Sequence, residues 1–242
     1  MTRRIRDLTI DGLAVALGTA TLSQISLGIK EWGGDFLTAS YITLPANRPK
    51  DNSNVLYLWE GSDIPWGSPP DARVAIPTNA MKADVTFSDI VVSMTSYIVG
   101  YAPAPDPTQV CASVVLDAGG LVGNALSVSI GVASIGTTSV TIRYAVLPGY
   151  RPAFYGNWIG LWEGEISPYN CPPPLSKKAV KDVTAGTVTI TDVPIKIDTR
   201  YTVVYFMHDI DKDANNTTAA AILRFDSTHP ESPKALTVIA NR

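Results

Sequence analysis

The sequence predicts an all-β protein built from two tandem β-sandwich domains, and three observations support this prediction. The run from Tyr41 to Gly61 recurs without a gap from Tyr144 to Gly164, with identical residues at 10 of 21 positions. β-Branched residues, glycine and proline are plentiful, which favours strands and turns over helices. Short alternating segments follow one another with turn residues between them. A repeat of about 100 residues is the size of a small domain and too long for a solenoid unit.

In the first copy, residues 8–17 (LTIDGLAVAL) alternate between apolar and polar positions and predict a first strand. A second strand is expected at residues 23–32. The proline-rich stretch 62–77 predicts a loop with an edge strand, because proline cannot donate to a sheet ladder. The remaining strands of this copy are expected at residues 55–61, 84–92, 96–101 and 111–117.

A second match indicates that the N-terminal segment belongs to the fold. Residues 12–18 (GLAVALG) match residues 125–131 (ALSVSIG) at an offset of 113, whereas the main repeat has an offset of 103. The difference implies ten extra residues in the first copy, at 31–40, whose Trp32 and Phe36 need cover from the neighbouring domain or from their own loop. A segment that recurs in mid-chain is not expected to be a removable leader, despite three arginines near the N-terminus.

The second copy shows seven candidate strands in about 100 residues, which is typical of a Greek-key sandwich of the immunoglobulin or fibronectin type III kind. They are expected at residues 125–135, 138–146, 158–163, 179–183, 186–193, 200–208 and 219–225. We therefore expect domains at 1–118 and 124–242, joined by a glycine-rich linker at 118–124. Residues 234–240 (KALTVIA) are expected to extend the second domain by a strand that pairs on a sheet edge or on a partner.

Three segments of the second copy carry a family resemblance. NWIGLW (157–162), GTVTITDVPI (186–195) and YTVVYF (201–206) resemble immunoglobulin-like sandwich domains with a D/N-W-I-G-I/L-Y/F strand, such as SKICH domains and the amino-terminal modules of purple acid phosphatases. The first copy has Leu56 and Tyr57 within the corresponding strand and lacks the full motif. The resemblance implies two tandem immunoglobulin-like β-sandwich domains, and non-catalytic modules.

Charge and composition exclude several classes of protein. Residues 1–122 carry a net charge of 8 − 12 = −4 and residues 123–242 one of 11 − 10 = +1, so neither half is basic enough to suggest nucleic acid. No apolar run reaches the 18 residues that a transmembrane helix requires. Cys111 and Cys171 occupy non-equivalent places in the two copies and are expected to be free thiols, with a bridge between them as the alternative. Without a signal peptide, the protein is expected to be cytoplasmic or released by a signal-independent route.

The candidate ligand-binding residues lie in the repeated loop. In a sandwich the connections after the second and sixth strands meet at one end, and aromatic, arginine and asparagine side chains there suit sugars or protein surfaces. The residues expected to bind a ligand are Tyr150, Arg151, Tyr155 and Asn157 in the second copy and Arg48 in the first. Alternatively, Arg48 and Arg151 anchor their loops by pairing with Glu60 and Glu163, and Trp59 and Trp162 are expected to be core residues.

An acidic stretch gives a candidate metal site. Asp209, Asp211, Asp213 and Asn215 alternate in a loop that leaves a strand, a spacing of oxygen ligands that Ca²⁺ accepts. The EF-hand pattern is incomplete, because Ala214 stands where the glycine is expected. A solvated polar hairpin loop is the alternative, and no cofactor other than this calcium ion is expected.

The motifs of common enzymes are absent: the sequence has no G-x-S-x-G, Walker loop, C-x-x-C or dinucleotide fingerprint, and its two histidines are isolated. We therefore expect a non-enzymatic protein that recognises a carbohydrate or protein receptor through end loops, for example as a secreted toxin or effector component. A structural protein that assembles as a homo-oligomer and a calcium-stabilised adhesin are the alternatives. An enzyme would need a pocket that unites His208 with carboxylates.

Overall fold

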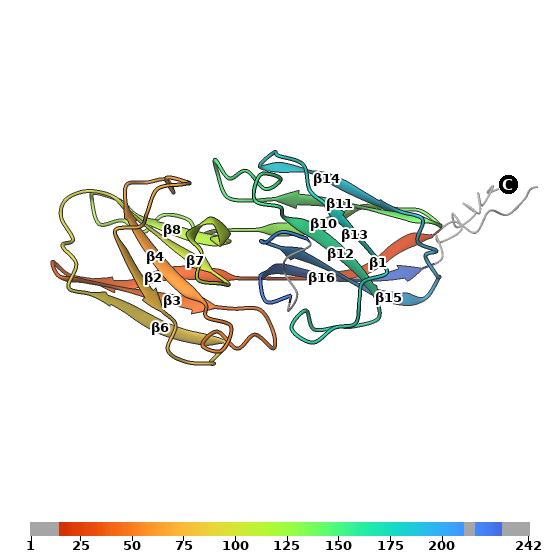
Figure 1. The fold of residues 1–242 in the computed structure, drawn as a ribbon, viewed down its shortest axis with the longest axis horizontal. Coiled ribbons are helices and arrows are strands. Elements are labelled where there is room, and N and C mark those ends of the chain that lie inside the picture. The colour runs from red at the N-terminus through yellow and green to blue at the C-terminus, as the bar shows by residue number, and fades with distance from the viewer. Residues whose placement is uncertain (1–14, 211–215, 229–242) are drawn as a thin grey trace, which may run out of the picture.

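The computed structural model describes residues 15–210 and 216–228, and its regular structure is almost entirely β strand (Figure 1). In chain order, the strands are β1 (Ala16–Gln24), β2 (Ser26–Trp32), β3 (Phe36–Ile42), β4 (Val55–Glu60), β5 (Ala72–Ala75), β6 (Lys82–Ser88), β7 (Tyr97–Ala102), β8 (Ala112–Leu116), β9 (Leu126–Ser127), β10 (Ser129–Ile135), β11 (Ser139–Ala145), β12 (Trp158–Glu163), β13 (Ser176–Ala179), β14 (Ala185–Thr191), β15 (Thr199–Phe206) and β16 (Ala219–Thr228). A short 3₁₀ helix, η1 (Pro107–Gln109), precedes β8. Within the described ranges, no helix has the length and apolarity to cross a membrane.

The strands form two sandwiches, each of a three-stranded and a five-stranded antiparallel sheet (Figure 1). In the first, β2-β3-β6 lies over β5-β4-β7-β8-β9, and in the second, β10-β11-β14 lies over β1-β16-β15-β12-β13. The prediction of two tandem immunoglobulin-like β-sandwiches is therefore confirmed. Buried side chains from both sheets of both sandwiches form one contiguous apolar cluster, so the two cores are joined.

The two copies match at a single offset of 103 from their first buried residue onward. Ile29 and Val132 are equivalent, and a β-bulge follows each of them in the pairing of β2 with β3 and of β10 with β11. The prediction of ten extra residues at 31–40 is therefore wrong, since those residues form the end of β2 and most of β3. The earlier match at 113 aligned small apolar residues that alternate in every strand, and such residues do not fix a register.

Each copy contributes one strand to the five-stranded sheet of the other. β1 precedes β2 of the first sandwich, yet it pairs with β16 of the second, from Ala16 opposite Thr228 to Gln24 opposite Ala221. β9 precedes β10 of the second sandwich and pairs with β8 of the first, with Ser127 opposite Ala112. The ranges 1–118 and 124–242 therefore do not describe closed sandwiches, because each five-stranded sheet includes a strand from the other range.

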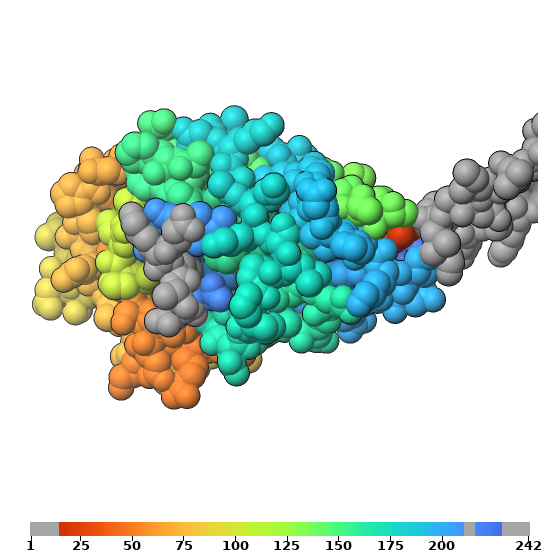
Figure 2. Space-filling view, turned by 45° about the vertical axis from the view of Figure 1, so that its right-hand side comes forward, coloured from red at the N-terminus to blue at the C-terminus, as the bar shows by residue number. Residues whose placement is uncertain are grey.

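After β1 and after β9, the chain passes from one sandwich to the other, and it does so at equivalent residues. Ile25 alone separates β1 from β2, Val128 alone separates β9 from β10, and both side chains are fully buried. The Ser127 hydroxyl donates a hydrogen bond to the Ile25 carbonyl over 2.6 Å, so the two crossings contact each other. Figure 2 shows the resulting broad contact between the first copy, in orange and yellow, and the second, in green and blue.

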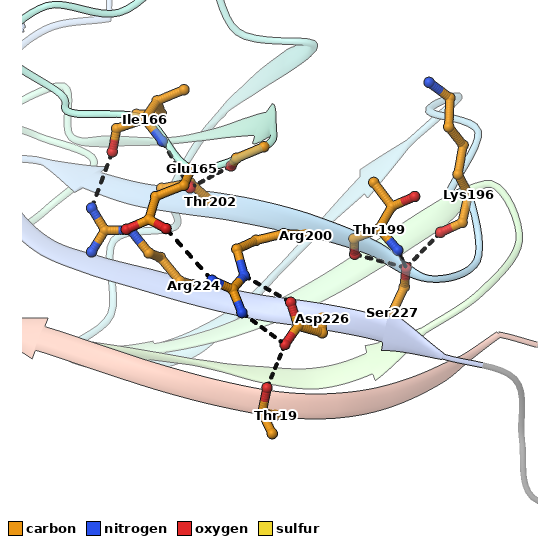
Figure 3. Close-up of polar contacts among 11 residues, drawn as sticks. Thr19, Glu165, Ile166, Lys196, Thr199, Arg200, Thr202, Arg224, Asp226 and Ser227 are labelled. Atoms are coloured by element: carbon orange, nitrogen blue, oxygen red, sulfur yellow. Dashed lines mark hydrogen bonds and ion pairs between the residues drawn. The ribbon is translucent and has the colours of Figure 1, made fainter.

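Side chains hold β1 on the second sandwich in addition to the backbone ladder (Figure 3). The Thr19 hydroxyl donates to the carboxylate of Asp226 on β16, and the Arg200 guanidinium on β15 donates to the same carboxylate from Nε over 2.8 Å and from Nη2 over 3.2 Å. Hydrogen bonds from Arg200 and then Thr19 lower the pKa of Asp226 to about 2. One carboxylate thus joins three adjacent strands, the first of which belongs to the other copy.

Four expected features differ from the structure or fall wholly or partly outside the described residues. Trp32 is 39% exposed and lies at the end of β2 remote from the crossing at Ile25, so the second sandwich does not cover it. The strand expected at 179–183 is instead β13, a few residues earlier. Residues 234–240, and most of the first strand expected at 8–17, lie outside the described ranges.

The strand exchange predicts an internal cross-link. Thr21 on β1 lies opposite Arg224 on β16, and paired Cα atoms in an antiparallel ladder lie within disulfide range. In a Cys171→Ser background, Thr21→Cys with Arg224→Cys should give a cross-linked monomer on oxidation, detected by mass spectrometry and non-reducing electrophoresis. Thr21→Cys with Arg73→Cys, on β5 of the first sandwich, is the control that should not cross-link within a monomer. Cross-linked dimers alone from the first pair would contradict the exchange.

Candidate functional site

The repeated loop is built on a buried asparagine in each copy. Asn157 is fully buried; Tyr205 donates its hydroxyl to Asn157 Oδ1 over 3.0 Å, and Asn157 Nδ2 donates to the Tyr150 hydroxyl over 3.1 Å. In the first copy, the Tyr101 hydroxyl donates to Oδ1 of the buried Asn54 over 2.6 Å. Burial raises the pKa of Tyr150 and of Tyr205, so both remain neutral hydrogen-bonding groups. In both copies the asparagine ties the loop to a neighbouring core strand, β7 in the first and β15 in the second.

The two repeated arginines pair with aspartates and not with the repeated glutamates. Arg48 Nε lies 2.7 Å from Asp51, and Arg151 lies 2.9 Å from Asp182 through Nε and 2.8 Å through Nη2. Glu163 instead contacts Lys196 over 2.7 Å, so the expected pairing of Arg151 with Glu163 is wrong. Arg151 lowers the pKa of the Asp182 carboxyl by hydrogen bonding to it. Asp182 lies in the β13–β14 connection, which no local pattern relates to the loop after β11.

Arg151, Phe154 and Tyr155 form a surface at the end of the β11–β12 loop, called here the 151–155 surface. Phe154 is 67% exposed, and Cζ of Arg151 lies 4.9 Å from the centroid of its ring. Tyr155 meets Phe154 edge-on at 5.0 Å and stacks on Tyr150 at 5.1 Å with an interplanar angle of 15°. The exposed side chains are therefore held from below by the buried Tyr150 and from the side by Asp182.

The five predicted ligand-binding residues differ in solvent exposure. Tyr150 is 2% exposed and Asn157 is fully buried, so their side chains support the loop. Arg151 and Tyr155 reach the surface, and Arg48 is exposed in the equivalent loop of the first copy. The ligand-binding role of these residues stays a prediction.

The β15–β16 loop meets the β11–β12 loop, as the sandwich pattern predicted. Gly156 has a φ of +73°, and a Cβ atom on it would lie 2.8 Å from the Asp209 Cα. Any side chain at Gly156 would therefore push the two loops apart. Asp211, Asp213 and Asn215, three of the four predicted calcium ligands, lie outside the described residues. Among the residues that are described, no group of three or more His, Cys, Asp and Glu side chains is placed to bind a metal.

Cys111 and Cys171 are not joined in a disulfide, so the prediction of separate thiols is confirmed and the alternative of a bridge between them is wrong. Cys111 is fully buried, and desolvation raises the pKa of its thiol. Cys171 is half-buried in the β12–β13 loop. The burial of Cys111 therefore opposes formation of a thiolate at that position.

Trp66 makes a contact between the two copies that was not predicted from the sequence. This residue lies in the β4–β5 loop, donates from Nε1 to the Pro148 carbonyl over 2.9 Å, and packs its ring 4.7 Å from that of Tyr150. A signal for it exists, because Pro65 and Trp66 align with Pro168 and Tyr169 at the offset of 103. The β4–β5 loop of the first copy therefore buttresses the base of the 151–155 surface.

Comparisons with known proteins leave the family open. No protein-family model matches the chain, and no curated protein sequence matches it significantly. Similar solved structures include the FN1–FN3 domains of chicken CNTN1 (11% identity, 84% of this chain and 66% of that one, TM-score 0.28) and trypsin-activated alpha-2-macroglobulin from Escherichia coli (11%, 83% and 16%, TM-score 0.27). Another is the receptor tyrosine kinase Torso (7%, 84% and 72%, TM-score 0.22). The chain spans less than two thirds of the first two proteins, and the fold assignment rests on its own strand order.

The buried asparagine should matter more for stability than for binding. We expect Asn157→Ala to lower the free energy of unfolding by about 2–3 kcal/mol, because it leaves the Tyr150 and Tyr205 hydroxyls buried without their partner. Chemical denaturation measures this difference. Asn124→Ala, at an exposed position, is the control and should change stability by less than about 0.5 kcal/mol. Equal stability of Asn157→Ala and the unmodified protein would contradict a structural role.

Proposed function

We propose that this chain is a non-enzymatic binding protein and that the 151–155 surface recognises a protein receptor. The observation that carries the proposal is an exposed phenylalanine ring fixed between an arginine and a tyrosine at the end of a β-sandwich. Aromatic residues and arginine are enriched at protein–protein interfaces and dominate their binding energy. Loops at the end of a sandwich are also where such domains commonly bind partners.

The support beneath this surface favours recognition over catalysis. Tyr155 stacks on the buried Tyr150, and Asp182 holds the Arg151 guanidinium in one plane, so little side-chain freedom remains to be lost on binding. Among the described residues, the surface has no adjacent nucleophile and base that would define a reaction. A non-enzymatic role is thus part of the proposal.

A protein ligand fits the surface better than a carbohydrate does. Sugars bind aromatic side chains through an open ring face, but the guanidinium of Arg151 already covers one face of Phe154. Arginine that is stacked on a ring and paired with a carboxylate is a common feature of protein interfaces. Three alternatives to this proposal remain open: a carbohydrate receptor, a role as a toxin or effector component, and a calcium-dependent adhesin. The binding assay below tests the carbohydrate and calcium alternatives.

Self-assembly is a second candidate because the free end of the first sandwich exposes apolar side chains. Trp32 is 39% exposed, Met94 88% and Leu121 70%, and the first two line one open depression of about 440 Å³. Clustered exposed apolar residues often mark interaction surfaces. Light scattering on the same samples as the binding assay detects such association.

The test is binding of the labelled full-length protein to a panel of cultured cells, before and after surface proteolysis or glycosidase treatment, with and without calcium. We expect protease-sensitive binding that Arg151→Ala and Tyr155→Ala each weaken by at least about tenfold, the effect of losing a moderate hot spot. Arg48→Ala, in the equivalent loop of the first copy, is the matched control and should weaken binding by less than about threefold.

Unchanged binding by both second-copy variants would overturn the assignment of the site. Binding that survives proteolysis but is lost on glycosidase treatment would overturn the protein receptor in favour of a glycan. Binding that requires calcium would favour the adhesin alternative.

A further inference from the structure

The loop that follows each repeated tryptophan strand is itself repeated, but with different lengths. Pro69 and Pro70 of the β4–β5 loop align with Pro172 and Pro173 of the β12–β13 loop at the offset of 103. Both loops close with the same backbone hydrogen bond, from Asp71 N to Leu58 O over 2.9 Å and from Leu175 N to Leu161 O over 2.8 Å. Between those anchors the second loop runs from 164 to 175 and the first from 61 to 71, so the first is shorter by one residue.

In the second copy, the proline-rich loop closes on the tryptophan. Trp162 is 2% exposed, and its indole Nε1 donates a hydrogen bond to the Pro172 carbonyl over 2.8 Å. The acceptor belongs to the run Cys171 to Pro174, in which three consecutive prolines restrict the backbone and leave its carbonyls free to accept. A buried indole donor is thus satisfied by an extended proline segment of the same chain.

In the first copy, the equivalent donor is buried but unpaired. Trp59 is also 2% exposed, yet its Nε1 has no hydrogen-bond partner among the described residues. Where the second copy has its closed loop, the first has an open cavity of about 340 Å³ beside Trp59. The cavity is lined by Trp59, the loop residues Ile64 to Pro69, and Pro107 and Thr108 of η1. Its volume lies within the range of about 300–1,000 Å³ that is usual for ligand pockets.

Two more buried polar atoms without partners belong to neighbouring residues. The Tyr57 ring centroid lies 5.8 Å from that of Trp59, and Gln109 ends the 3₁₀ helix whose first two residues line the cavity. Tyr57 OH and Gln109 Oε1 both lack a hydrogen-bond partner among the described residues. Native proteins leave few such groups, and each one calls for an explanation. Tyr57 and Gln109 therefore add two such groups close to Trp59, although Trp158 Nε1 of the second copy is also buried without a partner among the described residues.

Two contacts fix part of the cavity wall. Trp66 is held by its hydrogen bond to Pro148 and by its contact with Tyr150 of the second copy. Pro65, Pro69 and Pro107 contribute restricted backbone on the other sides. An aromatic and proline-lined groove with one indole donor is the type of surface that binds polyproline II segments.

We propose that this cavity binds an extended, proline-containing peptide segment of a partner protein, and that the β4–β5 loop shifts on binding so that a peptide carbonyl accepts a hydrogen bond from the Trp59 indole, whose Nε1 is buried in the unbound protein. The peptide takes the place that Cys171 to Pro174 occupies in the second copy. The missing residue in the first loop explains why its own prolines do not fill the site. This inference is independent of the proposed function, because the site lies in the first copy and shares no residue with the 151–155 surface.

The probe is a capped hexapeptide, Asn-Ser-Pro-Pro-Pro-Leu, which copies residues 170–175 with Cys171→Ser. It is titrated into ¹⁵N-labelled full-length protein while the indole N–H resonances are followed by NMR. We expect the Trp59 resonance to move with peptide concentration and the Trp162 resonance to stay in place, because its acceptor is already present. Trp59→Phe and Trp162→Phe assign the two signals.

Three variants test whether the peptide binds in the cavity beside Trp59. Trp59→Phe should weaken the peptide about fivefold, the factor for losing one neutral hydrogen bond, and Trp162→Phe should not weaken it. Ser68→Trp, which fills the cavity from an exposed loop position, should weaken it at least tenfold without unfolding the protein. Melting curves confirm that each variant is folded.

Three results would overturn the proposal. The first is a Trp59 resonance that does not move up to millimolar peptide. The second is unchanged affinity of the folded Ser68→Trp variant. The third is equal binding of the control peptide Asn-Ser-Ala-Ala-Ala-Leu, which lacks the prolines.

Discussion

The reciprocal pairing of β1 on β16 and of β9 on β8 is the constraint on which the rest of this structure depends. Each five-stranded sheet obtains its last strand from the other copy, so neither sandwich is complete alone. Both crossings consist of one buried aliphatic residue, Ile25 or Val128, which leaves no flexible linker at that point. The exchange brings the loops after β4 and β11 toward the contact between the copies. It is the reason that Trp66 of the first copy can support Tyr150 of the second.

The shared residues of the repeat keep the fold, and the differing residues create the candidate sites. Asn54 and Asn157 tie their loops to the core in both copies, and Trp59 and Trp162 are buried to the same extent. By contrast, Phe154 and Tyr155 have Asp51 and Asn52 as their counterparts at the offset of 103, so the exposed aromatic surface exists only in the second copy. In the first copy, a cavity of about 340 Å³ lies beside Trp59 and the shorter β4–β5 loop. Divergence after duplication has thus given each sandwich a different surface on a common frame.

The positions of most strands along the chain and the core tryptophans could be predicted from sequence because they depend on local signals. Alternation and β-branched residues indicated most strands, and the repeat indicated that there are two copies. Strand exchange could not be predicted, since a strand alternates in the same way whichever sheet it joins. The partner of Arg151 was missed for a similar reason: Asp182 is distant in sequence, and Glu163 pairs with Lys196 from another loop. Burial of Tyr150 and Asn157 followed from tertiary contacts that a loop pattern does not contain.

The most direct test of this account is whether the two copies unfold together. Because the apolar core is continuous and each sheet needs a strand from the other copy, we expect one cooperative transition in chemical denaturation. NMR signals of the Trp59 and Trp162 indoles report on the first and second sandwich separately. We expect the Trp59 and Trp162 signals of the folded protein to be lost at the same denaturant concentration. Separate midpoints, with one sandwich still folded after the other has unfolded, would contradict it.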